Sequence, residues 1–98
     1  MNDAVIVRYQ TTVDAAEENQ RAVERVYAEL AQTAPAGLRY LTLRLADGVT
    51  FVHIAIRDAQ DNPLNRSAAF AEFQRGLPQR QAEPPLPTPA TLVGLYGF

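Results

Sequence analysis

The chain has 98 residues, of which 47% are hydrophobic and 20% are charged, and its formal net charge is −2 at pH 7. This composition predicts one globular domain over residues 1–98, small enough to gain from burying surface against a partner. The charge offers no basic face to nucleic acid, and no apolar run approaches the roughly 20 residues of a membrane span. The start, MNDAVIVRYQ, lacks the basic and apolar parts of a signal peptide, so we expect a cytoplasmic protein that binds neither nucleic acid nor membranes.

Several chemistries are excluded by the residue types that the chain lacks. It has no cysteine and no lysine, so thiolate catalysis, disulfides, cysteine-bound metals and Schiff bases are ruled out. His53 is the only histidine and Ser67 the only serine. One histidine cannot build a His-rich metal site, and Ser67 in NRSAAF suits the first position of a helix better than a hydrolase triad. We therefore predict no metal site and no cofactor.

The first part of the chain predicts a strand and a long helix. Residues 4–10, AVIVRYQ, are apolar and β-branched, as in a strand. A helix is predicted over about 14–33, with Asp14 and Glu17 spaced as a capping box and Pro35 ending it. Its inward positions, three or four residues apart, are Ala16, Asn19, Val23, Val26, Tyr27 and Leu30.

Residues 38–57 predict a hairpin. Asp47 and Gly48 lie between two alternating runs and favour a two-residue type I′ turn. Counting outward from this turn gives the register. The predicted pairs are Leu45–Thr50, Arg44–Phe51, Leu43–Val52, Thr42–His53, Leu41–Ile54 and Tyr40–Ala55.

The remaining third predicts a loop, a short helix and a last strand. Residues 67–77 form the helix, closed by Gly76 and Pro78, and its Phe70 and Phe73 either fill the core or cap a pocket. The proline-rich 83–89 predicts an extended connector and 90–98 the strand. The complete order, β-α-β-β-α-β, predicts an α+β, ferredoxin-like fold: a four-stranded antiparallel sheet with two helices on one face.

The two faces of the predicted hairpin differ in chemistry. One is aliphatic, with Leu41, Leu43, Leu45, Val52, Ile54 and Ile56, and we expect it under the helices. The other is mixed, with Tyr40, Thr42, Arg44, Phe51, His53, Ala55 and Arg57, joined from the first strand by Ile6, Arg8 and Gln10, while Val5, Val7 and Tyr9 suit the core. Two helices cannot cover both faces. The mixed face therefore predicts a homodimer in which two sheets meet face to face.

The candidate site residues all lie on this mixed face. The candidate catalytic residues are His53, Tyr40 and Arg44, and the candidate ligand-binding residues are Arg8, Thr42 and Phe51. The alternative for His53 is a structural hydrogen bond to Thr42 or to the backbone. The arginines of this face, Arg57 included, either bind an anionic ligand or pair with acidic groups of the partner.

The element order, the long first helix and the passage PAGLRY, Pro35 to Tyr40, resemble the dimeric α+β-barrel proteins, in particular those like antibiotic biosynthesis monooxygenases. The resemblance covers about residues 4–98. It implies a homodimer with a small apolar or aromatic ligand, held between sheet and helices or inside the barrel. Catalytic proteins of this kind oxidise quinols or aromatic polyketides with molecular oxygen, often without a cofactor. A haem-degrading branch relies on Asn, Trp and His, and this chain has no Trp.

Two functions follow as hypotheses. The first is a cofactor-independent, monooxygenase-like enzyme acting on a small aromatic or quinol-type substrate. The second is a non-catalytic dimeric module that binds a ligand or serves as a scaffold. A cavity of roughly 300 Å³ or more with a few converging polar groups favours the enzyme or the ligand binder, and a filled interior favours the scaffold.

Overall fold

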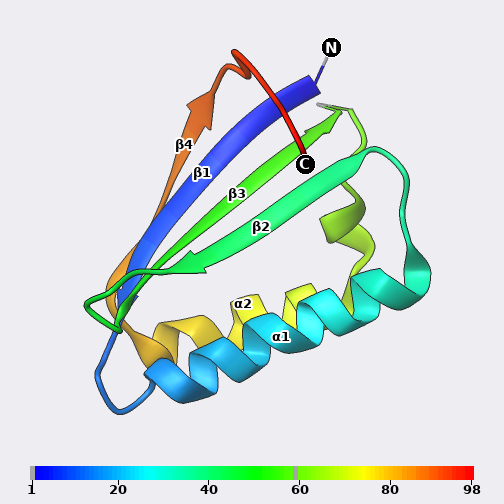
Figure 1. The fold of residues 1–98 in the computed structure, drawn as a ribbon. Helices are drawn as coiled ribbons and strands as arrows, with labels where there is room; N and C mark the ends of the chain where they lie inside the picture. Colours follow the sequence, from blue (N-terminus) through cyan, green and yellow to red (C-terminus); the bar gives the residue numbers. More distant parts are fainter. Residues whose placement is uncertain (1, 59) are drawn as a thin grey trace.

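The computed structural model describes residues 2–58 and 60–98. Its elements are β1 (Asn2–Thr11), α1 (Ala16–Thr33), β2 (Leu38–Arg44), β3 (Thr50–Asp58), the 3₁₀-helix η1 (Pro63–Arg66), α2 (Ala68–Arg80) and β4 (Gln81–Ala90). The four strands form one antiparallel sheet in the order β2-β3-β1-β4, and both helices lie on the same side of it (Figure 1). The predicted α+β, ferredoxin-like fold is confirmed.

The hairpin of β2 and β3 has the predicted register but a different turn. Arg44 pairs with Phe51, and the pairing continues unchanged to Tyr40 and Ala55. A type I′ turn needs a positive φ at both central residues, and in this loop only Gly48 has one, at 79°. Asp47 instead accepts hydrogen bonds from the backbone N–H groups of Val49 and Thr50, at 3.0 and 2.9 Å. The predicted type I′ turn is therefore wrong.

The prediction of which sheet face the helices cover is also wrong. The mixed face of the hairpin, not the aliphatic one, packs against the helices, and Phe51, His53 and Ala55 are buried there. The reason is the pairing of β1 with β3, which sets Tyr9 opposite Phe51 and Val7 opposite His53. Residues opposite one another share a face. The core positions of β1 therefore bring the aromatic side of β3 inward with them.

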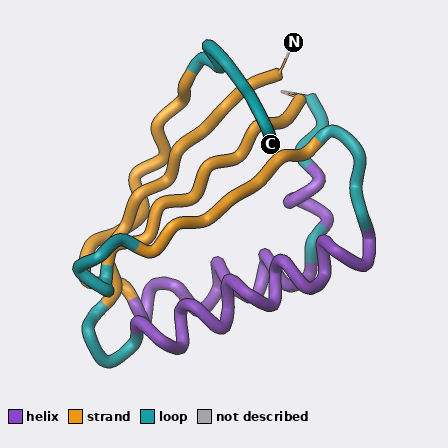
Figure 2. The backbone as a smooth tube through the Cα atoms, in the orientation of Figure 1, coloured by secondary structure: helices purple, strands orange, loops and turns teal. Residues whose placement is uncertain are grey.

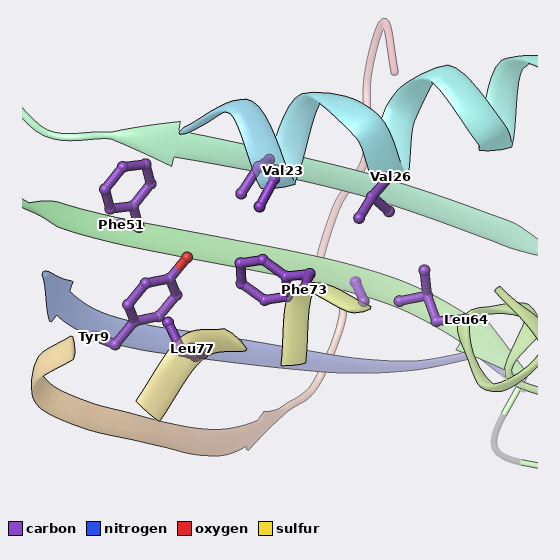
Figure 3. Packing of buried hydrophobic residues seen from close by; sticks show 9 residues of the cluster. Tyr9, Val23, Val26, Phe51, Leu64, Phe73 and Leu77 are labelled. Carbon is purple, nitrogen blue, oxygen red and sulfur yellow. The ribbon is translucent and has the colours of Figure 1, made fainter. Parts of the chain in front are cut away.

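The core lies between this face and the helices (Figure 3). Its buried members are Tyr9, Ala22, Val23, Val26, Phe51, Ala55, Leu64, Phe73 and Leu77. The rings of Tyr9 and Phe51 stack with centroids 5.6 Å apart, and Phe73 from α2 approaches Tyr9 at 6.2 Å. Stacked and tilted rings add attraction to the burial of their area.

The ends of the two helices differ from the predicted ones. No side chain caps the start of α1 at Ala15, so the predicted capping box of Asp14 and Glu17 is absent, whereas Ser67 caps α2 by accepting from the Phe70 N–H at 2.9 Å. The last turn of α2 also continues through Pro78 to Arg80.

Arg80 makes this last turn part of the interior. Its buried guanidinium lies 5.5 Å from the centre of the Phe73 ring. It donates to Oδ1 of Asn19 and to the carbonyl of Phe73, at 3.0 Å each. The hydrogen bond between Arg80 and Asn19 thus joins α2 to α1.

The fourth strand is the proline-rich segment, not the predicted 90–98. β4 pairs with β1 at the edge of the sheet, with register shifts between Arg8 and Thr11. An edge strand tolerates proline, because N–H groups on its outer side have no ladder partner. Residues 91–98 form an irregular tail that turns back across the side of the sheet opposite the helices (Figure 2), where the Phe98 carbonyl accepts a hydrogen bond from Arg39.

The sheet face opposite the helices, here called the open face, is aliphatic and largely uncovered. Ala4 and Ile56 at one end are 8% and 7% exposed. Exposure rises to 37% at Ile6, 50% at Leu43 and 69% at Leu86. An exposed and mostly aliphatic surface of this kind is typical of an interface.

We expect Gly76→Ala to lower the free energy of unfolding by about 1–2 kcal/mol. A Cβ at this position would lie 2.3 Å from Nη1 of Arg80, whose side chain is buried and held by two hydrogen bonds. Alanine is otherwise the better helix former, so the clash has to outweigh a gain of about 1 kcal/mol. Urea unfolding measures the difference, with Gly94→Ala as the control, since nothing lies within 4 Å of a Cβ there. Equal or higher stability of Gly76→Ala would contradict this packing.

Candidate functional site

A cavity of about 440 Å³ lies between the sheet and α2. Its walls are mostly apolar, with Val5 and Val7 from β1, Ala55 from β3, and Phe70 and Phe73 from α2. Pro85 and Pro87 of β4 close one side, and the polar groups Tyr9, Tyr40, His53 and Arg57 reach it from the sheet. An apolar hollow of this volume with a few polar groups is typical of a site for a small molecule.

His53 is the centre of the polar part of the cavity. It is 5% exposed, and both of its ring nitrogens are hydrogen-bonded. The Tyr9 hydroxyl lies 2.8 Å from Nε2, and the Tyr40 hydroxyl lies 2.6 Å from Nδ1. Thr42 Oγ1 is a more distant neighbour of Nδ1, at 3.3 Å, and its closer contact is the Tyr27 hydroxyl at 2.8 Å.

The hydrogen bonds behind His53 determine which nitrogen carries its proton. Nε of Arg80 donates to Oδ1 of Asn19, so the amide nitrogen of Asn19 faces Tyr9 and donates to its hydroxyl at 2.9 Å. The Tyr9 hydroxyl can then donate its own hydrogen bond to Nε2 of His53. The neutral ring consequently holds its proton on Nδ1 and donates it to Tyr40.

His53, Tyr9 and Tyr40 are all uncharged at neutral pH, and for the imidazole this is a result of burial. Burial lowers the pKa of His53 from 6.5 to about 4, so the imidazole is neutral at pH 7. It raises the pKa of Tyr9 to about 12 against the hydrogen bond from Asn19, and it raises the pKa of Tyr40 as well. The part of the site around His53 is therefore a set of neutral donors and acceptors, with Tyr9 and Tyr40 as weak acids and His53 as a weak base.

Tyr40 and His53 are the predicted catalytic residues that the structure brings together at the cavity. Arg44 lies outside it, bonded to Glu17 at 2.8 Å and to the carbonyl of Gly48 at 2.9 Å. That bond to Glu17 also lowers the pKa of the Glu17 carboxyl.

The three predicted ligand-binding residues line no part of this cavity. Thr42 supports the His53 ring and Phe51 is a core residue, 1% exposed. Arg8 is exposed and lies on the open face, opposite Val52 and Leu86.

Three residues of the site and its support were not predicted for it: Tyr9, Asn19 and Arg80. Arg57, which the sequence suggested as an arginine for an anionic ligand or for an ion pair with the partner, lines the cavity. Tyr9 was expected in the core, which is correct, but its hydroxyl is also part of the polar network. Asn19 carried a usable signal, because a polar residue on the inward side of a helix needs a buried partner. The signal for Arg80 was weaker: Gly76, one helical turn earlier, provides the space for its guanidinium.

The arrangement can bind and polarise a neutral ring that carries an oxygen. Tyr40 accepts from Nδ1 of His53, which strengthens its own hydroxyl as a donor towards the cavity.

Among residues 2–58 and 60–98, no group of three or more metal-ligating side chains occurs and no helix is long and apolar enough to cross a membrane.

Comparison with known proteins identifies the fold but no closer relative. No family model matches the chain, and no curated protein matches it. A solved Mycobacterium tuberculosis protein is similar over 97% of this chain and 98% of its own, with 18% identity and a TM-score of 0.79. A Nitrosomonas europaea protein with the provisional name antibiotic biosynthesis monooxygenase is similar over 98% of this chain and 92% of its own, with 20% identity and a TM-score of 0.79.

The same fold occurs in an oxygenase. The structure of a mutant of SnoaB, a cofactor-independent oxygenase from Streptomyces nogalater, covers 99% of this chain and 98% of its own, at 19% identity and a TM-score of 0.70. At these identities the likeness concerns the fold. The chain thus has the ferredoxin-like fold of the antibiotic biosynthesis monooxygenase-like proteins, as the resemblance in its sequence implied.

We expect NMR of the single imidazole to give a pKa near 4 for His53, with the proton on Nδ1 in the neutral form. The unfolded chain, with a pKa near 6.5, takes up this proton first as the pH falls. The stabilisation is therefore complete above pH 6.5 and is lost between pH 6.5 and 4, by about 2 kcal/mol from pH 7 to pH 5. Urea unfolding at both pH values measures this loss, with His53→Gln as the control without the titration. A pKa at or above 6.5 would contradict the buried network.

Proposed function

We propose that this protein binds a small aromatic molecule in the cavity beside α2 and oxidises it with molecular oxygen, without a bound cofactor. The observation that supports this proposal most directly is the 440 Å³ apolar cavity with the Tyr40–His53 pair at its polar end. The fold shared with a cofactor-independent oxygenase supports the proposal. A phenol or quinol-type substrate suits a site with aromatic walls and neutral hydrogen-bonding groups.

The residues of this chain contribute position and polarisation. The ring of the substrate lies among Val7, Phe70 and Phe73, and its oxygen accepts a hydrogen bond from Tyr40. As the phenol O–H loses its proton, the negative charge that develops on the substrate oxygen is stabilised by the Tyr40 hydroxyl in a dry site, and the electron-rich ring then gives electrons to O₂. His53 acts through Tyr40, as a positioning residue. In the balanced reaction, a phenol with an open ring position becomes a quinone with one atom of O₂, and the second atom leaves as water with the two hydrogens removed.

A second candidate is a binding module that performs no reaction. The observation that favours it is the low pKa of His53, because a base with a pKa of about 4 accepts a substrate proton poorly at pH 7. The cavity would then hold its aromatic ligand unchanged. A cytoplasmic location stays a prediction from the sequence.

We expect Tyr40→Phe to lower kcat for oxygen uptake by about a hundredfold with little change in KM, because the lost hydrogen bond acts mainly on the developing charge. The ring stays, so its stacking on Tyr27 at 5.2 Å is kept. An oxygen electrode with 1-naphthol and 1,4-dihydroxynaphthalene measures the rates. Tyr96→Phe, on a fully exposed ring, is the control. Tight binding of both compounds without oxygen uptake would favour the binding module.

We also propose that the protein is a homodimer whose two open faces pack together. The mixed face, through which the sequence predicted this dimer, is covered by α1 and α2 and is not available. The open face replaces it: it is aliphatic at Ile6, Leu43 and Leu86, and two copies of such a surface are complementary to each other. A 10.8 kDa domain gains much from this extra burial.

Light scattering is expected to give a mass near twice 10.8 kDa that persists on dilution. Leu43→Glu should convert the protein into monomers, since a carboxylate between two apposed apolar sheets is costly to bury. Val13→Glu provides the matched control, because Val13 is 80% exposed in the loop before α1. A monomeric wild-type protein would rule out this interface.

A further inference from the structure

We propose that the ligand of the cavity carries an acidic group, a carboxylate, and that Arg57 binds it. The inference rests on the proposed binding of an aromatic molecule and narrows its class to an aromatic acid. Arg57 belongs to β3, two residues beyond Ala55 and four beyond His53, so all three side chains project from the same face of the strand. Arg57 lines the cavity together with them.

Arg57 lines the cavity, and among the described residues no carboxylate forms an ion pair with its guanidinium. Its Nε is the one buried side-chain nitrogen or oxygen without a hydrogen-bond partner among the described residues. Other arginines have partners: Arg44, Arg66 and Arg75 pair with carboxylates, and Arg80 bonds to Asn19 and to the carbonyl of Phe73. Asp3 stands opposite Arg57 on β1, yet no ion pair joins them.

The chemistry of the Arg57 guanidinium determines which class of ligand it can bind. A buried donor without an acceptor is unfavourable, and a ligand oxygen would satisfy it. A guanidinium is planar and binds a carboxylate through two parallel hydrogen bonds. Asn62 also lines the cavity, and its Oδ1 is already occupied by the Leu64 N–H at 3.1 Å, which leaves the amide NH₂ as a further donor.

The spacing sets the size of the ligand. His53 and Arg57 are four residues apart along a strand, about 13 Å. Ala55 lies midway, and its small side chain leaves room for an aromatic ring above it. The Tyr40 hydroxyl lies at the His53 end of this span, 2.6 Å from Nδ1, so a phenol oxygen at Tyr40 and a carboxylate at Arg57 fit the two ends of a molecule with one or two rings. The ligand class is therefore a hydroxylated aromatic acid.

Calorimetric titration with three probes tests this inference: 6-hydroxy-2-naphthoate, its methyl ester and 2-naphthol. Wild-type protein should bind the acid at least tenfold more tightly than the ester. Arg57→Gln should remove this preference and leave the affinity for 2-naphthol unchanged. Arg57→Lys, which keeps the charge but loses the planar fork, should retain only part of it. Arg21→Gln, an equal change of charge on the exposed side of α1, should behave as wild type.

The outcomes separate this inference from the proposed function. Equal binding of acid and ester by the wild-type protein overturns the role of Arg57, even where Arg57→Gln fails to fold, and leaves the aromatic site intact if 2-naphthol binds. A preference for the acid that Arg57→Gln preserves also overturns it. Failure of all three probes to bind contradicts both the acid site and the aromatic site.

Discussion

The hydrogen bond from the Tyr9 hydroxyl to Nε2 of His53 connects the packing of this domain with the chemistry of its cavity. An imidazole buried this deeply is stable only if both nitrogens have partners. Tyr9 supplies one of them from β1, and that requires the aromatic side of β3 to face the helices. The amide of Asn19 and the buried guanidinium of Arg80 continue this network from Tyr9 into both helices.

The sequence was sufficient for the element order and for the register of the 38–57 hairpin, but not for the position of the last strand or for the side of the sheet that faces the helices. Both faces of the 38–57 hairpin offered enough apolar area to be a core, so hydrophobicity alone favoured the aliphatic one. The deciding fact is a long-range register, Tyr9 with Phe51, which local periodicity does not contain. The prediction that Val5, Val7 and Tyr9 lie in the core was correct, and combined with that register it gives the right face.

The site was predicted in part for a related reason. His53 and Tyr40 stood out as the only imidazole and its near neighbour across the hairpin, and the structure joins them. Arg44 shares their face but lies at the opposite end of the strand pair from Arg57, next to α1, where Glu17 neutralises it. The position along a strand, and not only its parity, decides whether a side chain reaches the cavity. The network behind His53 joins residues 61 positions apart, beyond any short motif.

The prolines of β4 have a consequence for how this protein associates with copies of itself. N–H groups of alternate strand residues point to the same side, so Pro85, Pro87 and Pro89 remove donors from the outward edge, while Leu86 and Thr88 keep theirs on the side of β1. A strand from another molecule would find few donors there. This edge is thereby protected against the sideways growth of the sheet that leads to aggregates and fibrils, even though the domain exposes a broad aliphatic surface.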